Sequence, residues 1–155
     1  MFIIAYCDTV AYSGYYGKVK CRKSLFMEEK TFLNLGVQEY SSVLVFSPPE
    51  HHVQAIAHMD LPKGASVSYV GDGMFDVVLI FARNQRDVSE LAAAGVAVLK
   101  KTGFLWFAYP SPKSQLATDI SASKGWDTLF DAGWSLGDSF ELDNNWIAAK
   151  FSENI

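Results

Sequence analysis

The run Phe75–Phe81, FDVVLIF, is the segment that most narrows the folds open to this chain. Apart from Asp76 it is apolar, and it lacks the alternation of a strand that has one solvated face. Such a strand is typical of a parallel sheet that is buried on both faces. The shorter run Ser42–Phe46, SVLVF, has the same character. We therefore predict a mostly parallel sheet with helices on both faces.

Helical and strand patterns alternate between and after these two runs. Pro48-Pro49 ends the first strand, and a helix follows around Val53 to Asp60 before Pro62-Lys63-Gly64 breaks it. Residues 66–70 are predicted as a short second strand, which the turn Gly71-Asp72-Gly73 closes.

The clearest helix follows the FDVVLIF strand. Apolar residues from Val88 to Leu99 recur at i, i+3, i+4 and i+7, which gives a single apolar stripe. Asn84 is the predicted N-cap, and Lys100-Lys101 are expected in the last turn, where the helix dipole favours cations. Thr102-Gly103 is the predicted stop of this helix.

The remaining segments predict one more buried strand, one helix and a hairpin. The strand covers residues 104–109, the helix about 121–132, and the hairpin pairs 139–142 with 146–151. This order predicts an α/β, three-layer fold with a mostly parallel sheet and a C-terminal antiparallel hairpin.

Residues 1–26 differ from the rest of the chain. They contain both cysteines, Cys7 and Cys21, and four of the seven tyrosines, and their net charge is 4 − 1 = +3, against 9 − 16 = −7 for residues 27–155. Two interpretations stay open: an N-terminal arm that packs on the domain, or a peripheral extension with Met27 as the natural start. We expect residues 27–155 to form a single α/β domain.

Composition excludes several classes of protein. Half of the 155 residues are apolar and 14% are aromatic, which excludes a disordered chain. Thirteen basic against 17 acidic residues argue against a nucleic-acid or anionic-membrane partner. Apolar runs fall short of the ~20 residues that a membrane span needs, and no signal peptide is recognisable. We therefore expect a soluble, cytoplasmic domain.

Two sets of motifs resemble known families. Phe75-Asp76-Val77-Val78 and the segment Leu99-Lys100-Lys101-Thr102-Gly103 are similar to the "fDvV" strand and the "L-K-x-G-G" turn of class I methyltransferases. The resemblance implies a reduced methyltransferase-like, Rossmann-like topology.

Over roughly residues 34–151 the chain resembles, more closely, a bacterial family of short proteins of unknown function. The family usually has a lysine directly after its Tyr/Trp-Pro pair, whereas here that lysine is Lys113, two residues later. The matching anchors are Leu35-Gly36-Val37, Val43-Leu44-Val45 with Pro49, Asp76-Val78-Leu79-Phe81, Trp106 with Tyr109-Pro110, Thr118-Asp119, and Trp146 with Lys150-Phe151.

The loop after the first strand argues against a bound nucleotide-type cofactor. Adenosylmethionine and dinucleotide sites need glycines there, whereas this chain has Ser47-Pro48-Pro49-Glu50, and two prolines remove two amide donors. We therefore expect no cofactor, and a non-catalytic ligand-binding or interaction module rather than an enzyme. The alternative is a small enzyme with a non-standard pocket, such as an S-adenosylmethionine-dependent methyltransferase.

Ligands of open α/β sheets bind beyond the carboxyl ends of the strands. Arg83 there could clamp a carboxylate or phosphate, or pair with Asp87 or Asp119. Asp119 is alternatively the N-cap of the following helix, and Asp72 a turn residue or a ribose ligand. The candidate residues at this edge are Ser47, Glu50, Asp72, Arg83, Asn84, Tyr109, Lys113 and Asp119.

Histidines and tryptophans complete the candidates. His51, His52 and His58 are predicted to be solvated helix residues, and we expect no metal site, because ~1.5 Å of rise per residue separates His51 from His58 too far for one ion. Trp106 and Trp126 are predicted in the core. Trp146 is predicted as an exposed anchor for a partner chain or for a homodimer.

Overall fold

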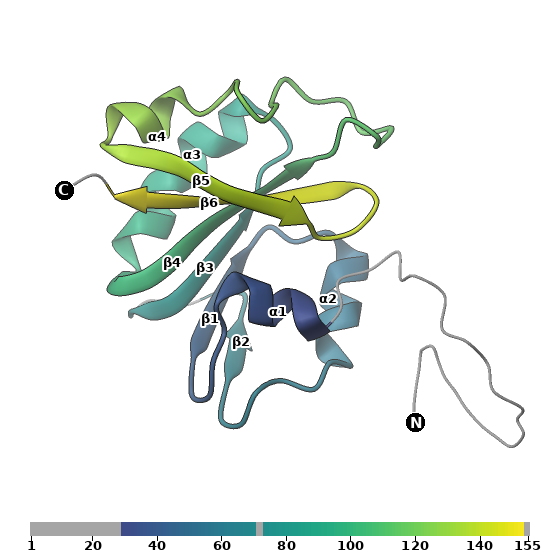
Figure 1. Ribbon diagram of the computed structural model, residues 1–155, viewed down its shortest axis with the longest axis vertical. Helices are drawn as coiled ribbons and strands as arrows, with labels where there is room; N and C mark the ends of the chain where they lie inside the picture. The colour runs from purple at the N-terminus through teal and green to yellow at the C-terminus, as the bar shows by residue number, and fades with distance from the viewer. Residues whose placement is uncertain (1–28, 71–72, 154–155) are drawn as a thin grey trace, which may run out of the picture.

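The strand expected at Phe75–Phe81 lies inside the sheet of the computed structural model, which describes residues 29–70 and 73–153 (Figure 1). Within these residues the strands form one sheet in the order β2-β1-β3-β4-β6-β5. Strands β1 to β4 are parallel, whereas β6 runs antiparallel to both β4 and β5. The bounds of the strands are Ser42–Phe46 (β1), Ser66–Ser68 (β2), Phe75–Phe81 (β3), Leu99–Pro110 (β4), Trp134–Glu141 (β5) and Trp146–Glu153 (β6).

Helices cover both faces of this sheet, as the buried strands require. Figure 1 shows α3 and α4 together on one side and α1 and α2 on the other. Val78 and Ile80 of β3 point to the first side, whereas Val77, Leu79 and Phe81 point to the second. The α/β three-layer prediction is therefore confirmed. The helices are Glu29–Leu35 (α1), Glu50–Ala57 (α2), Gln85–Ala97 (α3) and Asp127–Asp131 (α4).

The α3 helix begins as predicted but ends earlier. The Asn84 side chain accepts a hydrogen bond from the Asp87 N–H, so Asn84 is the N-cap. The helix ends at Ala97, and Lys100 and Lys101 belong to β4, so the predicted last turn and the Thr102-Gly103 stop are wrong. The apolar stripe continues past the helix because the residues that follow it enter the buried sheet.

The start of β4 is irregular, so the pattern of apolar residues did not predict it as part of the strand. Leu99 pairs with Phe75, but the next pair joins Phe104 to Val77, so β4 carries extra residues between these two pairs. A Cβ atom on Gly103 would lie 2.8 Å from the Asp76 carbonyl oxygen. The glycine therefore permits a close approach of two strands and does not end a helix.

Other elements differ in length from the sequence predictions. The helix predicted at 121–132 is confined to Asp127–Asp131, because Ser121 and Lys124 pair in a tight turn before it. Both hairpin strands are longer than expected, and α1 was not predicted. None of the helices described is long and apolar enough to cross a membrane. The segment 1–26, Met27 and Asp72 lie outside the described residues.

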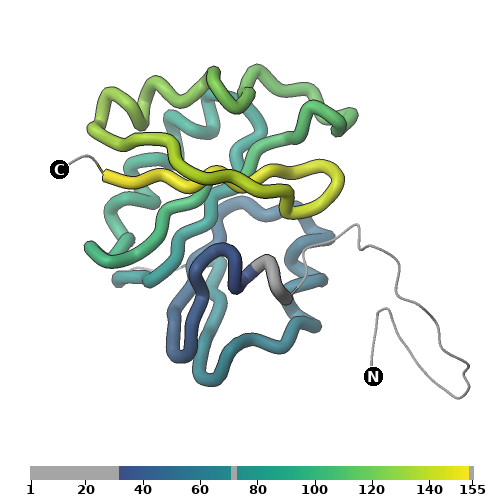
Figure 2. The backbone as a smooth tube through the Cα atoms, viewed as in Figure 1, coloured from purple at the N-terminus to yellow at the C-terminus, as the bar shows by residue number. Residues whose placement is uncertain are grey.

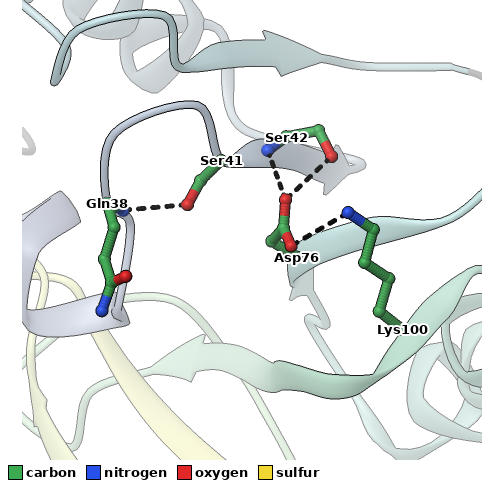
Figure 3. A network of polar contacts seen from close by, with 5 residues as sticks. All are labelled: Gln38, Ser41, Ser42, Asp76 and Lys100. Atoms are coloured by element: carbon green, nitrogen blue, oxygen red, sulfur yellow. Dashed lines mark hydrogen bonds and ion pairs between the residues drawn. The ribbon is translucent and has the colours of Figure 1, made fainter.

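A polar network at the amino ends of β1 and β3 holds these two strands in register (Figure 3). One oxygen of Asp76 accepts from the Ser42 N–H at 2.8 Å and from its hydroxyl at 3.3 Å. The other oxygen lies 3.1 Å from Lys100 Nζ, which comes from the irregular start of β4. The Ser42 N–H, together with Lys100, lowers the pKa of Asp76 below its ordinary value, although partial burial opposes the shift.

Replacing Asp76 with asparagine should therefore destabilise the fold at neutral pH. We expect Asp76→Asn to lower the free energy of unfolding by about 1 kcal/mol, because the partly exposed carboxylate loses its charge. A carboxyl whose folded pKa is lowered stabilises above its unfolded pKa, and this contribution disappears as the pH falls through the folded value. Urea unfolding at several pH values should thus show the two proteins converging below about pH 4. Asp60→Asn, at an exposed position, is the control; a constant difference at every pH would contradict the assignment.

Candidate functional site

The candidate site lies at the edge where the parallel strands β1, β3 and β4 end. The strand order reverses direction between β1 and β3, which makes their carboxyl ends the switch point of the sheet. Because β6 is antiparallel to β4, the turn between β5 and β6 reaches the same edge: Trp146, the first residue of β6, pairs with Pro110, the last residue of β4. Polar residues from distant parts of the sequence are therefore brought together here.

Several predicted site residues lie exposed at this edge. Ser47 follows β1 directly with a positive φ of 54°, and Glu50 begins α2. Arg83 and Asn84 follow β3, and Lys113 and Asp119 follow β4.

Three of these residues have partners that explain them structurally. Asn84 caps α3. Asp119 accepts from the Gln85 N–H at 2.8 Å, so it stabilises the start of α3, and the prediction that it caps the helix after it is wrong. Lys113 Nζ lies 3.2 Å from Glu141 of β5, an exposed ion pair of small energetic value.

Two predictions about aromatic residues at this edge need correction. Tyr109 is only 3% exposed and packs against Trp126 in the core beneath α3 and α4, so it does not line an open crevice. Trp146 is 2% exposed and contacts Phe81 edge to face, so it is no exposed anchor for a partner. The register of β6 against β4 turns the Trp146 ring toward the core that α1 and α2 cover. Trp106 and Trp126 are buried, as predicted.

Arg83 is a predicted site residue whose guanidinium group is exposed and can bind a ligand. Its guanidinium carbon lies 5.8 Å from the centre of the Trp146 ring, and the side chain is exposed. The backbone N–H of Arg83 donates to Asp87, but within the described residues its guanidinium has no carboxylate oxygen within 4.0 Å. The predicted ion pairs with Asp87 and Asp119 are thus absent from this part of the chain.

A second group of side chains, which the sequence did not predict as a site, lies beside Trp146. His51 and His52 in the first turn of α2 meet Asp143 from the β5–β6 turn, and Figure 2 shows that turn, in yellow, next to α2. His52 Nε2 is 2.8 Å from Asp143 Oδ2, and His51 Nε2 is 3.6 Å from the same oxygen. The His52 side chain is fully buried, so the prediction of solvated histidines is wrong for this residue.

Local structure fixes the position of Asp143. Its Oδ1 accepts hydrogen bonds from the N–H groups of Asn145 at 2.7 Å and Trp146 at 2.9 Å, which form the predicted turn at 143–145. Burial by itself would raise the pKa of Asp143, but the His52 imidazole and these two N–H groups outweigh it, so the pKa lies below its ordinary value. Asp143 therefore presents a charged oxygen, Oδ2, to the histidines.

Aromatic rings surround His52. His52 packs against the rings of His51 and Phe81, with centroids 4.4 and 5.1 Å away. Burial, and the neighbouring His52, lower the pKa of His51, although Asp143 opposes the shift. Imidazole nitrogens and a carboxylate oxygen converge here, and these are groups that transfer protons or bind divalent transition metals.

Spacing along the chain gave no sign of this group. His51 and His52 are adjacent on a helix, and Asp143 follows β5, so only the sheet order places them together. The one signal in the sequence was the pair of histidines close to Pro48-Pro49, shortly after the end of a buried strand.

Comparisons with known proteins support the fold and stop there. No protein-family model and no curated protein matches the sequence. A cyclopropane-fatty-acyl-phospholipid synthase-like protein from Lactobacillus casei has a similar structure, with a TM-score of 0.51 and 8% identity over 79% of this chain and 88% of that one. A SAM-dependent methyltransferase from Aquifex aeolicus gives a TM-score of 0.48 and 14% identity, over 82% and 89% of the two chains. The chain thus has a class I methyltransferase-like fold, and identities this low carry no information about its chemistry.

Removing the Asp143 carboxylate should destabilise the protein. We expect Asp143→Ala to lower the free energy of unfolding by about 3 kcal/mol, since it breaks a buried pair and leaves two turn N–H groups unpaired. Asp143→Asn keeps an oxygen for these N–H groups and should cost less. Chemical denaturation of both variants, with Asp138→Ala at an exposed position as control, measures the difference. Equal stabilities for Asp143→Ala and the control would refute this account of the turn.

Proposed function

We propose that this chain, with its methyltransferase-like fold, is a small-molecule-binding domain that recognises a carboxylate or phosphate group through Arg83. The observation that carries the proposal is the exposed Arg83 guanidinium over Trp146, at the switch point of the sheet and without an acidic partner in residues 29–70 and 73–153. A guanidinium binds planar oxyanions through two parallel hydrogen bonds.

The other cations described near the strand ends support Arg83 as the anion-binding residue. Lys113 forms an ion pair with Glu141. Arg86, three residues after Arg83, forms an ion pair with Glu90 at 2.8 Å. Only the buried Ala82 separates Arg83 from β3, and the β4–β6 pairing holds Trp146 beneath it. The residues that support the Arg83 guanidinium are therefore held in place, which lowers the entropic cost of ordering this side chain when a ligand binds.

The loop after β1 favours binding without methyl transfer. Ser47 takes a positive φ, and Pro48 and Pro49 follow it, so two backbone amide donors are missing where adenosylmethionine-type sites present them. Shortly after this loop, the buried His52 packs against Phe81 at the end of β3. The ligand we propose is thus held by side chains at the strand ends rather than by a glycine-rich backbone.

A second candidate function is S-adenosylmethionine-dependent methyl transfer by a small enzyme with a non-standard pocket. SAM-dependent methyltransferases are among the solved structures similar to this chain, which supports this candidate. The carboxylate of adenosylmethionine is also a group that Arg83 could bind.

A thermal-shift and calorimetric titration tests the main proposal. The probes are inorganic phosphate, adenosine monophosphate and S-adenosylhomocysteine, applied to the wild type, Arg83→Ala and Arg86→Ala. We expect phosphate or the nucleotide to raise the Tm of the wild type and of Arg86→Ala, whereas Arg83→Ala loses at least ~10-fold in affinity, as the loss of a charged hydrogen bond predicts.

Two outcomes would contradict the proposal. If no probe binds the folded wild type, or if both arginine variants lose binding equally, Arg83 is not the anion site. If S-adenosylhomocysteine alone binds, and Arg83→Ala retains it, methyl transfer becomes the better assignment.

A further inference from the structure

Beyond anion binding, we propose that His51, His52 and Asp143 form a binding site for a divalent transition-metal ion of the zinc or iron(II) type. The three side chains each offer one donor atom, and these atoms all lie within 4.8 Å of one another. Two imidazoles and one carboxylate are a donor set that such ions prefer, whereas magnesium and calcium prefer oxygen alone.

Two of the distances between donor atoms lie within about 0.5 Å of the spacing around a single ion. Bonds of about 2.0–2.1 Å in tetrahedral geometry place neighbouring donor atoms about 3.3 Å apart. His51 Nε2 and Asp143 Oδ2 are 3.6 Å apart, close to this spacing. His52 Nε2 and Asp143 Oδ2 are 2.8 Å apart, so they need to separate by about 0.5 Å to admit the ion.

The orientation of the buried groups is the second observation that points to a ligand. His52 Nε2 and Asp143 Oδ2 are close, but neither atom has a partner in hydrogen-bond geometry within the described chain, and His52 Nδ1 also lacks one. Buried polar atoms without partners are costly and rare in native proteins. Donor atoms that lie close without aiming at each other have the arrangement of metal ligands, which aim at a shared point.

The surroundings of the three side chains supply outer contacts that orient the carboxylate, an apolar cover and access to solvent. Hydrogen bonds from Asn145 and Trp146 to Oδ1 of Asp143 fix the carboxylate and leave Oδ2 to bind, which is how outer contacts orient a ligating group. The ring of Phe81 covers His52. The His51 side chain is 36% exposed, so an ion entering beside it keeps a path to solvent and at least one open coordination position.

The alternative for these residues is a buried ion pair between protonated His52 and Asp143. It explains the 2.8 Å contact, but it leaves His52 Nε2 and Asp143 Oδ2 outside hydrogen-bond geometry. A metal ion satisfies all three donor atoms with one ligand.

Metal binding to the full-length chain, with any affinity tag removed, tests the proposal. The chain is first treated with a chelator, and Zn²⁺ is then titrated by calorimetry and Co²⁺ by its absorption spectrum. Cys7 and Cys21 are replaced by serine in the background, because thiolates also bind these ions. We expect one equivalent of Zn²⁺ per chain and a Co²⁺ spectrum of four- or five-coordinate nitrogen and oxygen ligands, with no binding of Mg²⁺.

Single substitutions assign the ligands. His51→Ala and Asp143→Asn should each weaken Zn²⁺ binding by more than about 100-fold, a loss at least as large as that from removing an outer-sphere contact. His58→Ala is the matched control: His58 lies at the other end of α2, is exposed, and contacts the Gln54 carbonyl. Circular dichroism must show each variant folded; Asp143→Asn retains the turn acceptor and His51 is only half-buried, so both should fold.

The result that overturns the proposal is equally specific. A folded wild type that binds neither Zn²⁺ nor Co²⁺ in the micromolar range leaves the buried ion pair as the role of these residues. Binding that His58→Ala weakens as much as His51→Ala places the metal elsewhere. Neither result bears on the proposed anion site, because Arg83→Ala is tested with phosphate and the nucleotides and not with metal ions.

Discussion

Burial of β3 on both faces is the constraint on which the rest of this structure depends. A strand with Val77 and Leu79 facing one layer and Val78 and Ile80 facing the other requires helices on both sides. The α3 helix meets this need so closely that a Cβ atom on Gly95 would lie 2.5 Å from the Ile80 side chain. The strands on either side of β3, β1 and β4, run parallel to it, so the carboxyl ends of all three lie at one edge of the sheet.

The two edges of the parallel strands differ in their polar residues: those at the amino ends stabilise the fold, and the candidate site residues lie at the carboxyl ends. At the amino ends, Asp76 ties Ser42 to Lys100 and fixes three strands relative to one another. At the carboxyl ends, α2 and α3 begin and the β5–β6 turn reaches α2. Asp143 contacts His52 and the Trp146 N–H there, and the Arg83 guanidinium lies over the Trp146 ring.

The accuracy of the sequence predictions followed the strength of each local signal. The Asn84 cap and the turn of the hairpin at 143–145 were correct because each rests on contacts between near neighbours. The buried strands were correct because their apolar runs are continuous over several residues. The end of α3 and the length of α4 were wrong, since apolar residues continue from helix to strand at Val98 and Leu99 without a change in composition. Trp146 was placed at the surface because a hairpin strand at the chain end has no sequence signature of the face it buries.

The sequence by itself determined the fold class and the edge at which polar residues would gather, because short apolar runs encode strand burial and the alternation of strands with helices favours a parallel sheet. Only the tertiary structure decided which residues meet there. His51, His52 and Asp143 share no motif, and their contact depends on β6 pairing antiparallel with β4, which returns the chain to the first strand's end. Long-range pairing of this kind is set by the energy of the whole sheet, so no local pattern records it.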